Sequence, residues 1–318
     1  MQVQQAVSIT KALQSQILIL DGAMGTLIQN SLLAKEDKSV YDLLNLTKPE
    51  LITQIHTDYL LAGAHILKTN TFNANAISLA NFGLESLAYR LNFSGAQIAQ
   101  QAILEFNKTQ TKNKEVHFVA GCMGPTSQMR PLSFDSNTQF QKNMDFSKLK
   151  NAYYTQAKGL MEGGVDVFLI ETIVDLYTAK AALYAIEDLF KEKQKQIPIL
   201  CSLTLTKEGN CFSGESLAHS LSSLSKFSLL SIGLNCMEAQ IMGPYLEQIA
   251  SQFPLYVSAH PNAGLPNTLG QYSQSPAQIL SFLTPLLKKS ILHIVGGCCG
   301  TTPAYTKAVA DTLHCIRK

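Results

Sequence analysis

The chain has 318 residues, of which 46% are hydrophobic and 15% charged, so it can bury a large core and is not a disordered protein. Its 25 basic and 23 acidic residues nearly balance, and no run of like charges forms the basic surface that nucleic-acid binding needs. No apolar stretch reaches the length of a membrane span and the polar N-terminus lacks the layout of a signal peptide, so we expect a cytoplasmic protein with no nucleic-acid or membrane partner.

Eight short apolar runs recur along the chain and predict eight strands. They span residues 17–20, 66–68, 116–120, 167–170, 199–205, 230–234, 255–259 and 291–295. The runs are continuous rather than alternating, as in strands that are covered on both faces. Segments with helical periodicity, such as 147–161 and 175–189, lie between them. This alternation predicts an α/β fold, a (β/α)8 TIM barrel that forms a single domain over residues 1–318. A doubly wound open sheet is the alternative, but the Gly-rich phosphate turn that it needs after the first strand is absent.

Three predicted helices begin with a capping residue and a proline. Thr47 is the expected N-cap of the first, with Pro49 in its first turn and Glu50 at the capping-box position. The other two begin at Ser275-Pro276 and Thr302-Pro303.

The segments that follow the predicted strands are rich in small, polar and sulfur-containing residues. They are 21–26, 69–73, 121–126, 171–175, 235–236, 260–267 and 296–303. Because a (β/α)8 barrel carries its chemistry at the carboxyl ends of its strands, these segments predict a site at that rim.

Cysteines give the sharpest signal at this rim. Seven cysteines, an odd number in a reducing compartment, do not indicate a disulfide framework. Cys236 follows the sixth strand, and Cys298 and Cys299 follow the eighth, where flanking glycines permit a turn that presents both thiols. Three thiolates would form a partial shell for Zn²⁺ with one position open. The alternative is that they are small packing residues, as we expect for the remaining cysteines, Cys122, Cys201, Cys211 and Cys315.

Carboxylates and backbone amides at the same mouth suggest an amino-acid clamp. Asp21 and Glu171 end the first and fourth strands and could hold an ammonium group, although a salt bridge or a helix cap is an equal alternative. Gly22 and Ala23 offer backbone N–H groups that suit a carboxylate.

Other residues at the rim have competing interpretations. The Gly296-Gly297 loop is at the position where many such barrels bind phosphate. His260 could be a fourth metal ligand or a base, but a packed rim histidine is favoured. A Schiff-base role for Lys68 is weakly supported.

Seven blocks together resemble the homocysteine methyltransferase family. They lie at residues 20–26 (LDGAMGT), 69–73 (TNTFN), 124–126 (GPT), 170–172 (IET), 233–236 (GLNC), 260–267 (HPNAGLPN) and 296–303 (GGCCGTTP), and the resemblance runs from about residue 17 to 313. The last two blocks look most like the N-terminal module of cobalamin-dependent methionine synthase, and less like the betaine-dependent or S-methylmethionine-dependent branches.

The resemblance implies a zinc barrel that binds homocysteine as its zinc thiolate. It makes Cys236, Cys298 and Cys299 the zinc ligands. It places Asp21 and Glu171 at the amino group of the substrate, Gly22 and Ala23 at its carboxylate, and Asn235 where it orients the pocket. Two residues depart from the family pattern: many relatives have an acid in place of Lys68 and an aliphatic residue in place of Cys122.

The methyl donor is the remaining expectation. No folate or cobalamin module is visible in this sequence, so methylcobalamin would be supplied by a separate folate- and cobalamin-binding chain, and homocysteine would be methylated to methionine. One alternative is a free-standing methyltransferase that uses S-methylmethionine or another small donor. A second is a non-catalytic zinc- or thiol-binding protein.

Overall fold

Eight parallel strands form one sheet that closes into a barrel. The structure is a computed structural model that describes residues 8–31, 40–110, 115–127, 145–268 and 270–316. The strands are β1 (Leu18–Ile19), β2 (Ile66–Lys68), β3 (Phe118–Met123), β4 (Val167–Ile173), β5 (Ile199–Leu203), β6 (Ser231–Glu238), β7 (Tyr256–Asn262) and β8 (Ile294–Val295). Their order is β1-β8-β7-β6-β5-β4-β3-β2. A parallel bridge from Leu20 to Ile66 joins the first and last strands of this order. The predicted (β/α)8 barrel is confirmed.

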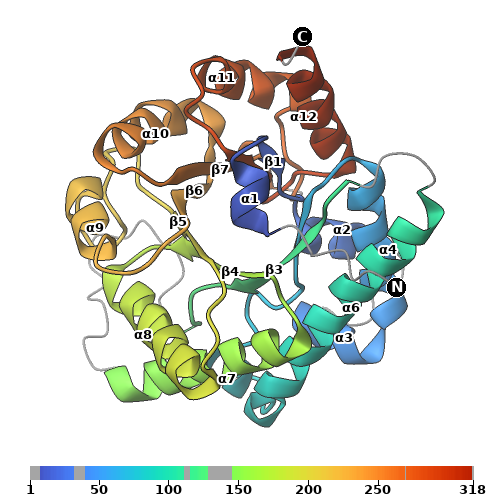
Figure 1. The fold of residues 1–318 in the computed structure, drawn as a ribbon, viewed down its shortest axis with the longest axis vertical. Coiled ribbons are helices and arrows are strands. Elements are labelled where there is room, and N and C mark those ends of the chain that lie inside the picture. The colour runs from blue at the N-terminus through green and yellow to red at the C-terminus, as the bar shows by residue number, and fades with distance from the viewer. Residues whose placement is uncertain (1–7, 32–39, 111–114, 128–144, 269, 317–318) are drawn as a thin grey trace.

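Helices surround the strands as an outer ring (Figure 1). The ring consists of α4 (Pro49–Leu61), α6 (Ala88–Thr109), α7 (Phe146–Gly163), α8 (Leu176–Lys193), α9 (Leu217–Leu224), α10 (Ala239–Gln252), α11 (Pro276–Lys288) and α12 (Pro303–Ile316). Shorter elements are α2 (Met24–Asn30), α3 (Leu44–Thr47), α5 (Ala76–Ala80) and the 3₁₀ turns Tyr41–Leu43 and Glu85–Leu87. Each long helix packs an apolar face against the strands, as Leu183, Ile186 and Leu189 do on α8. Among the described residues, no helix is long and apolar enough to cross a bilayer.

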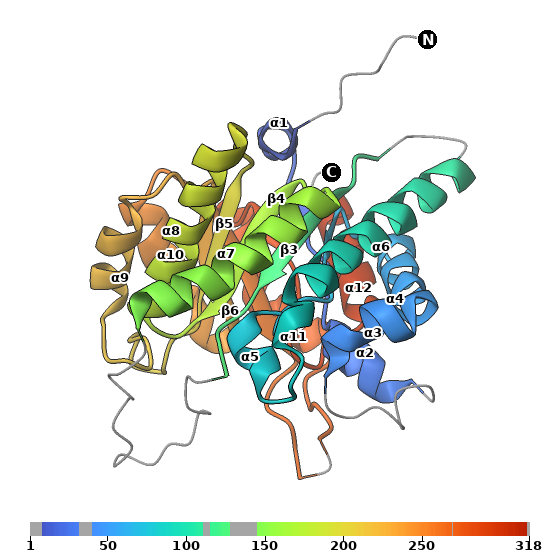
Figure 2. The same cartoon turned by 90° about the horizontal axis from the view of Figure 1, so that it is seen from below.

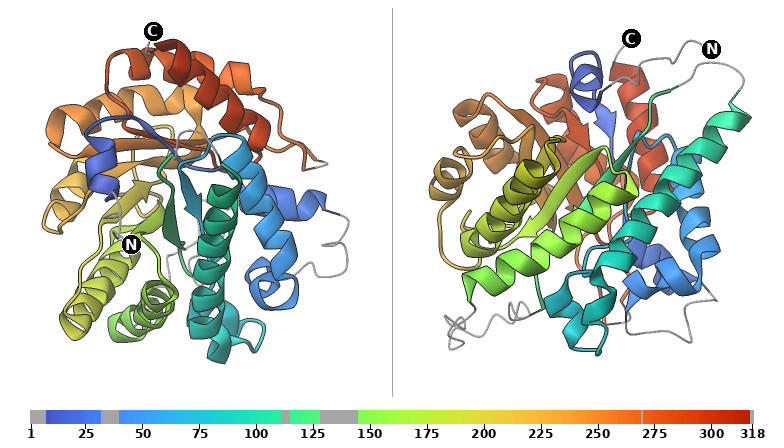
Figure 3. Two further views of the ribbon diagram at one scale, coloured as in Figure 1. Left: turned by 45° about the vertical axis from the view of Figure 1, so that its right-hand side comes forward. Right: turned by 60° about the horizontal axis from the view of Figure 1, so that its bottom comes forward.

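The N-terminal helix α1 (Ile9–Leu13) covers one end of the barrel. Its residues Ile9, Ala12 and Leu13 are buried in an apolar cluster with Leu18 and Phe118 from the strands. Figures 2 and 3 show α1 at one end of the barrel, while the orange segment that follows β7 extends at the other end. The carboxyl ends of the strands therefore lie at the end of the barrel opposite α1.

The predicted helix starts had mixed outcomes. The capping box at the start of α11 is present, because the Ser275 side chain accepts from the Gln278 amide and the Gln278 side chain from the Ser275 amide. Pro303 begins α12 as expected. The expected N-cap at Thr47 was wrong. Thr47 is the last residue of α3, and Lys48 precedes Pro49 without a side-chain cap, because the helical turn before it already fixes the Thr47 backbone.

Strands β4 and β6 extend past their predicted ends through irregularities. The register shifts between Ile170 and Ile173 on β4 and between Asn235 and Glu238 on β6. Thr172 and Cys236 have positive φ angles of 59° and 58° at these two places. Bulges of this kind redirect side chains and are frequent beside active sites.

Candidate metal and substrate site

Three cysteine sulfurs converge at the carboxyl ends of the strands. The sulfurs of Cys236, Cys298 and Cys299 all lie within 4.8 Å of one another, and those of Cys298 and Cys299 are 4.0 Å apart. A tetrahedral zinc site with Zn–S bonds near 2.3 Å would place its sulfurs about 3.8 Å apart. The donor set and spacing therefore fit a zinc ion with small adjustments. The role of these residues as ligands stays a prediction.

Backbone geometry explains how neighbouring cysteines face the same point. Cys236 is turned out of the regular strand by its positive φ angle at the bulge of β6. The Cys298 amide donates to the Pro261 carbonyl at 2.8 Å, and the Cys299 carbonyl accepts from the Ala263 amide at 2.9 Å. These bonds fix the β8–α12 loop to the segment that follows β7.

The three neighbouring thiols shift one another's pKa values. Hydrogen bonds with the other two sulfurs raise the pKa of Cys236. Hydrogen bonds from Cys236 and Cys298 hold the pKa of Cys299 well below its usual range. The cluster therefore stabilises thiolate at one sulfur, which is the form that binds metals.

A buried lysine lies against the carboxylate of Asp21. Asp21 is 1% exposed and Lys68 is 7% exposed. The Lys68 amide donates to Asp21 Oδ2 at 2.8 Å, its Nζ lies 3.8 Å from Asp21 Oδ1, and Nζ donates to the Gly297 carbonyl at 3.0 Å. Burial raises the pKa of Asp21 to about 7, although Lys68 opposes the shift. Burial alone would lower the pKa of Lys68, but the carboxylates of Glu171 and Asp21 raise it. The salt-bridge alternative for Asp21 is thus observed.

Glu171 on β4 is contacted by side chains from β3 and β6. The Cys122 thiol donates to Glu171 Oε1 at 2.9 Å, and Asn235 Nδ2 lies 3.5 Å from Glu171 Oε2. Asn235 and Thr172 are joined by two hydrogen bonds, from the Thr172 amide at 2.9 Å and to the Thr172 hydroxyl at 2.8 Å. Asn235 Nδ2 also donates to the Cys298 sulfur at 3.9 Å, so one amide connects the carboxylate with the sulfur cluster.

Comparison with known proteins identifies the family. The family model for homocysteine S-methyltransferase matches residues 18–313. The chain belongs to the homocysteine S-methyltransferase family. The fold is similar to that of the homocysteine methyltransferase MmuM from Escherichia coli. Its metallated form has a TM-score of 0.77 at 23% identity, covering 94% of this chain and 98% of that one. Its oxidized form has a TM-score of 0.76 at 23% identity, covering 94% and 97%. The resemblance inferred from the seven blocks is confirmed.

Backbone amides at the rim of this homocysteine S-methyltransferase family member are bonded within the protein, which changes two of the predictions made from the sequence. The Gly296 amide donates to the Ala259 carbonyl and the Gly297 amide to the Asp21 carbonyl, each at 3.0 Å. Both amides are used within the protein, so the phosphate interpretation of this loop was wrong. The Ala23 amide donates to the Thr301 carbonyl over a long distance of 3.4 Å. For the Ala23 amide to bind a substrate carboxylate, as the sequence predicts, this hydrogen bond must first break.

The other rim residues are placed as follows. His260 is fully buried on β7 and lies outside the sulfur group, as a packed histidine would. Burial lowers the pKa of its imidazole well below the usual range. Lys68 is held as a charged ammonium by its carboxylate neighbours, which removes the basis for a Schiff-base role because that chemistry needs a neutral amine.

The cysteines outside the cluster divide into two kinds. Cys122, Cys201 and Cys211 are buried, as expected. Cys315 is exposed, so its expected packing role was wrong. Leu313 faces the core from α12, and a residue two positions further along a helix points to the opposite side.

Two contacts at the site were missed in the sequence. Thr172 pairs with Asn235, and its only signal was its place directly after Glu171. Cys122 was expected only to pack, but its thiol also supports the Glu171 carboxylate.

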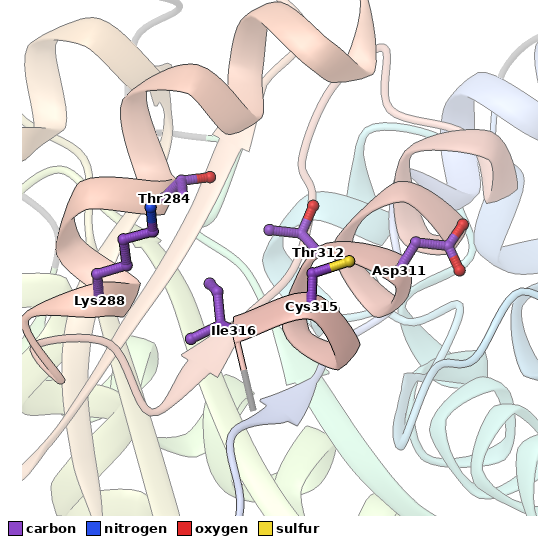
Figure 4. Close-up of a pocket in the computed structure, with 6 residues that line it drawn as sticks. All are labelled: Thr284, Lys288, Asp311, Thr312, Cys315 and Ile316. Carbon is purple, nitrogen blue, oxygen red and sulfur yellow. The ribbon is translucent and has the colours of Figure 1, made fainter. Parts of the chain in front are cut away.

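A hollow lies away from this site, on the outer surface of the barrel. It has a volume of about 400 Å³ between the carboxyl-terminal parts of α11 and α12. Figure 4 shows its lining side chains, including Lys288, Asp311 and Cys315, which do not converge on one point. It offers no cluster of chemical groups comparable with the sulfur rim.

Proposed function

We propose that this chain binds homocysteine with its thiol at a zinc ion held by Cys236, Cys298 and Cys299, and methylates it to methionine. The observation that carries the proposal is the convergence of three sulfurs within 4.8 Å at the strand ends. Cysteine sulfurs are preferred zinc ligands, and three protein ligands leave a fourth position for a substrate. A bound zinc ion would keep a coordinated thiol deprotonated near neutral pH and so supply the nucleophile.

The protein side chains would bind and orient the substrate. The buried carboxylates of Glu171 and Asp21 at the mouth would hold the amino group of homocysteine. Gly22 and Ala23 are the proposed contacts for its carboxylate. A Cβ at Gly22 would lie 2.7 Å from the Tyr59 hydroxyl, so the chain approaches closely there. Asn235 stands between Glu171 and Cys298 and would fix their relative positions.

The reaction needs little else from the protein. The homocysteine thiol releases its proton to solvent, its sulfur attacks the methyl carbon and forms the S–C bond, and the bond from methyl to donor breaks with its electron pair leaving on the donor. Holding both reactants in line accounts for much of such an acceleration. The proposed donor is methylcobalamin on a separate chain that also binds folate, and the likeness of blocks 260–267 and 296–303 to methionine synthase supports this choice.

Metal content is the first test. Protein purified under reducing conditions and offered Zn²⁺ should take up one zinc ion per chain, measured by elemental analysis. Absence of stoichiometric uptake would contradict the metal centre.

Donor choice is the second test. Methionine formation should be measured with methylcobalamin alone, with methylcobalamin plus a cobalamin-binding protein, and with S-methylmethionine. We expect transfer from methylcobalamin or its protein complex. Transfer from S-methylmethionine alone would overturn the donor assignment and keep the zinc centre. Bound zinc and homocysteine without transfer from any donor would indicate a binding protein.

A further inference from the structure

Lys68 brings a positive charge into the place where the proposed substrate needs negative charge. It belongs to β2, its side chain is 8% exposed, and its Nζ is bonded to the Gly297 carbonyl at 3.0 Å and lies 3.8 Å from Asp21 Oδ1. Gly297 directly precedes Cys298. The ammonium therefore lies between the carboxylate of the first strand and the loop that carries two of the three sulfurs.

The contacts hold this ammonium firmly. Asp21 accepts from the Lys68 backbone amide at 2.8 Å as well as facing its Nζ, so both residues are fixed to each other. A lysine stem buried in a strand has few rotamers available, and removing its charge from water requires a partner. Asp21 is the carboxylate within ion-pair distance of Lys68 in the described residues.

Lys68 reduces the net negative charge of the carboxylate group at the mouth. Asp21 and Glu171 carry two negative charges when ionised, and Lys68 carries one positive charge, so the group has a net charge of −1 rather than −2. Glu171 is contacted by the neutral groups of Cys122 and Asn235 and has no ion pair within 4.0 Å among the described residues. Burial raises the pKa of Glu171 and the charge of Lys68 opposes that shift, so the ammonium pairs directly with Asp21 and also acts on Glu171.

We propose that Lys68 determines specificity by offsetting the negative charge of the Asp21 and Glu171 carboxylates that would hold the α-ammonium of the thiol substrate. This inference rests on the proposed function, since it concerns the same substrate. It predicts that the site prefers amino-acid thiols less strongly than it would without the Lys68 charge. The site should therefore also accept ω-mercapto acids, which lack the α-ammonium.

Two substrates separate this role from general damage. Homocysteine and 4-mercaptobutyrate share the thiol, the chain length and the carboxylate, and differ only in the ammonium. Their affinities for the zinc-loaded protein are measured by calorimetry, and kcat/KM is measured for each. A change in zinc binding or folding would alter both substrates together, whereas a change at the ammonium subsite alters their ratio.

The first pair of variants tests whether the positive charge at position 68 sets the substrate ratio. Lys68→Gln should raise the preference for homocysteine over 4-mercaptobutyrate about tenfold or more, because a like charge a few ångströms away in a buried site has at least that effect on binding. Lys68→Arg keeps the charge and should leave the ratio within about threefold of wild type. An unchanged ratio in Lys68→Gln, with zinc content and thermal midpoint retained, would overturn the proposal.

A second neutral variant keeps the test decisive if Lys68→Gln fails to fold. Lys68→Met keeps an unbranched side chain and removes the ammonium, so it should shift the ratio in the same direction as Lys68→Gln. An unchanged ratio in a folded, zinc-loaded Lys68→Met protein would overturn the proposal. Wild-type protein that takes up zinc but not homocysteine, or neither, would instead overturn the proposed function and this inference with it.

Discussion

At the scale of single residues, Asn235 connects the two halves of the site. Its side chain contacts Glu171, Thr172 and the Cys298 sulfur, and its carbonyl accepts from the Thr204 hydroxyl at 3.0 Å. Because Asn235 directly precedes Cys236, any motion of this residue moves a sulfur and a carboxylate contact together. Asn235 therefore connects the sulfur cluster with the Glu171 carboxylate.

Replacing one sulfur should separate metal binding from folding. Cys298→Ser is expected to weaken zinc binding by more than about 100-fold, because even residues that only orient metal ligands contribute 10–100-fold. Methyl transfer should fall with zinc content. The matched control Cys315→Ser removes an exposed thiol on α12 and should keep both. Full zinc content and turnover in Cys298→Ser would show that the ligand assignment is wrong.

Glu171 gives a complementary prediction for the substrate. Glu171→Gln keeps the shape of the side chain and removes its negative charge, so homocysteine should bind at least about tenfold more weakly. Zinc stoichiometry should remain at the wild-type value. Glu187→Gln removes a carboxylate on α8 and serves as the control. Loss of zinc in Glu171→Gln would instead assign this carboxylate to support of the metal.

Residue types at the rim could be predicted, but their pairings could not. The cysteines and acids follow apolar runs, so their end of the barrel was deduced from order along the chain. The bonds from Lys68 to Asp21 and from Cys122 to Glu171 join residues 47 and 49 positions apart. They depend on which way each side chain points inside the closed barrel, and a single sequence does not contain that information.

At the scale of elements, the bulges of β4 and β6 make the site. The sequence predicted that these strands end at residues 170 and 234, because polar residues follow there. The structure continues pairing to Ile173 and Glu238. The polar residues are thus strand residues turned inward by local distortion, and apolar periodicity does not report such a distortion.

The β8–α12 loop allows a test of whether its backbone conformation positions the cysteine sulfurs. Gly300 has a φ angle of +80°, and a Cβ there would lie 2.1 Å from the ring of Tyr272. The Tyr272 side chain is hydrogen-bonded to Cys299. Gly300→Ala should displace Tyr272 from this contact and lower zinc affinity at least about tenfold. Thermal midpoint and zinc affinity are the measurements.

Gly83→Ala is the matched control for Gly300→Ala. Gly83 also has a positive φ angle, +68°, but a Cβ there meets nothing within 4 Å. It should lose about 1 kcal/mol of stability from backbone conformation alone and keep its zinc affinity. Equal zinc affinities in the two variants would mean that the Tyr272 contact does not support the sulfur cluster.

At the scale of the whole molecule, burial sets both the fold and its response to acid. Eight continuous apolar runs were enough to predict the number of strands, but closure was not encoded in any one of them. It depends on the bridge between Leu20 and Ile66 and on the bond from the Asp21 amide to the Ile66 carbonyl at 3.0 Å. The same closed interior buries ionisable groups far from the site.

His56 on α4 is the clearest of these buried groups. It is fully buried, and neither ring nitrogen has a hydrogen-bond partner in the part of the chain that the structure describes. Burial lowers the pKa of His56 from 6.5 to about 4. Between pH 6.5 and pH 4 the His56 imidazole is therefore protonated in the unfolded chain and neutral in the folded chain. The contribution of His56 to stability is complete above pH 6.5 and is lost as the pH falls toward 4.

His56→Leu should remove this dependence. Relative to wild type, the free energy of unfolding of the variant should rise by about 2 kcal/mol between pH 7 and pH 5, which follows from the two pKa values. Urea unfolding at the two pH values measures this difference. Asp42 acts in the opposite direction, because burial raises its pKa to about 6 and the folded state then retains a proton, but it is present in both proteins and cancels. If the difference between variant and wild type were the same at pH 7 and pH 5, His56 would not be held neutral by burial in the folded protein.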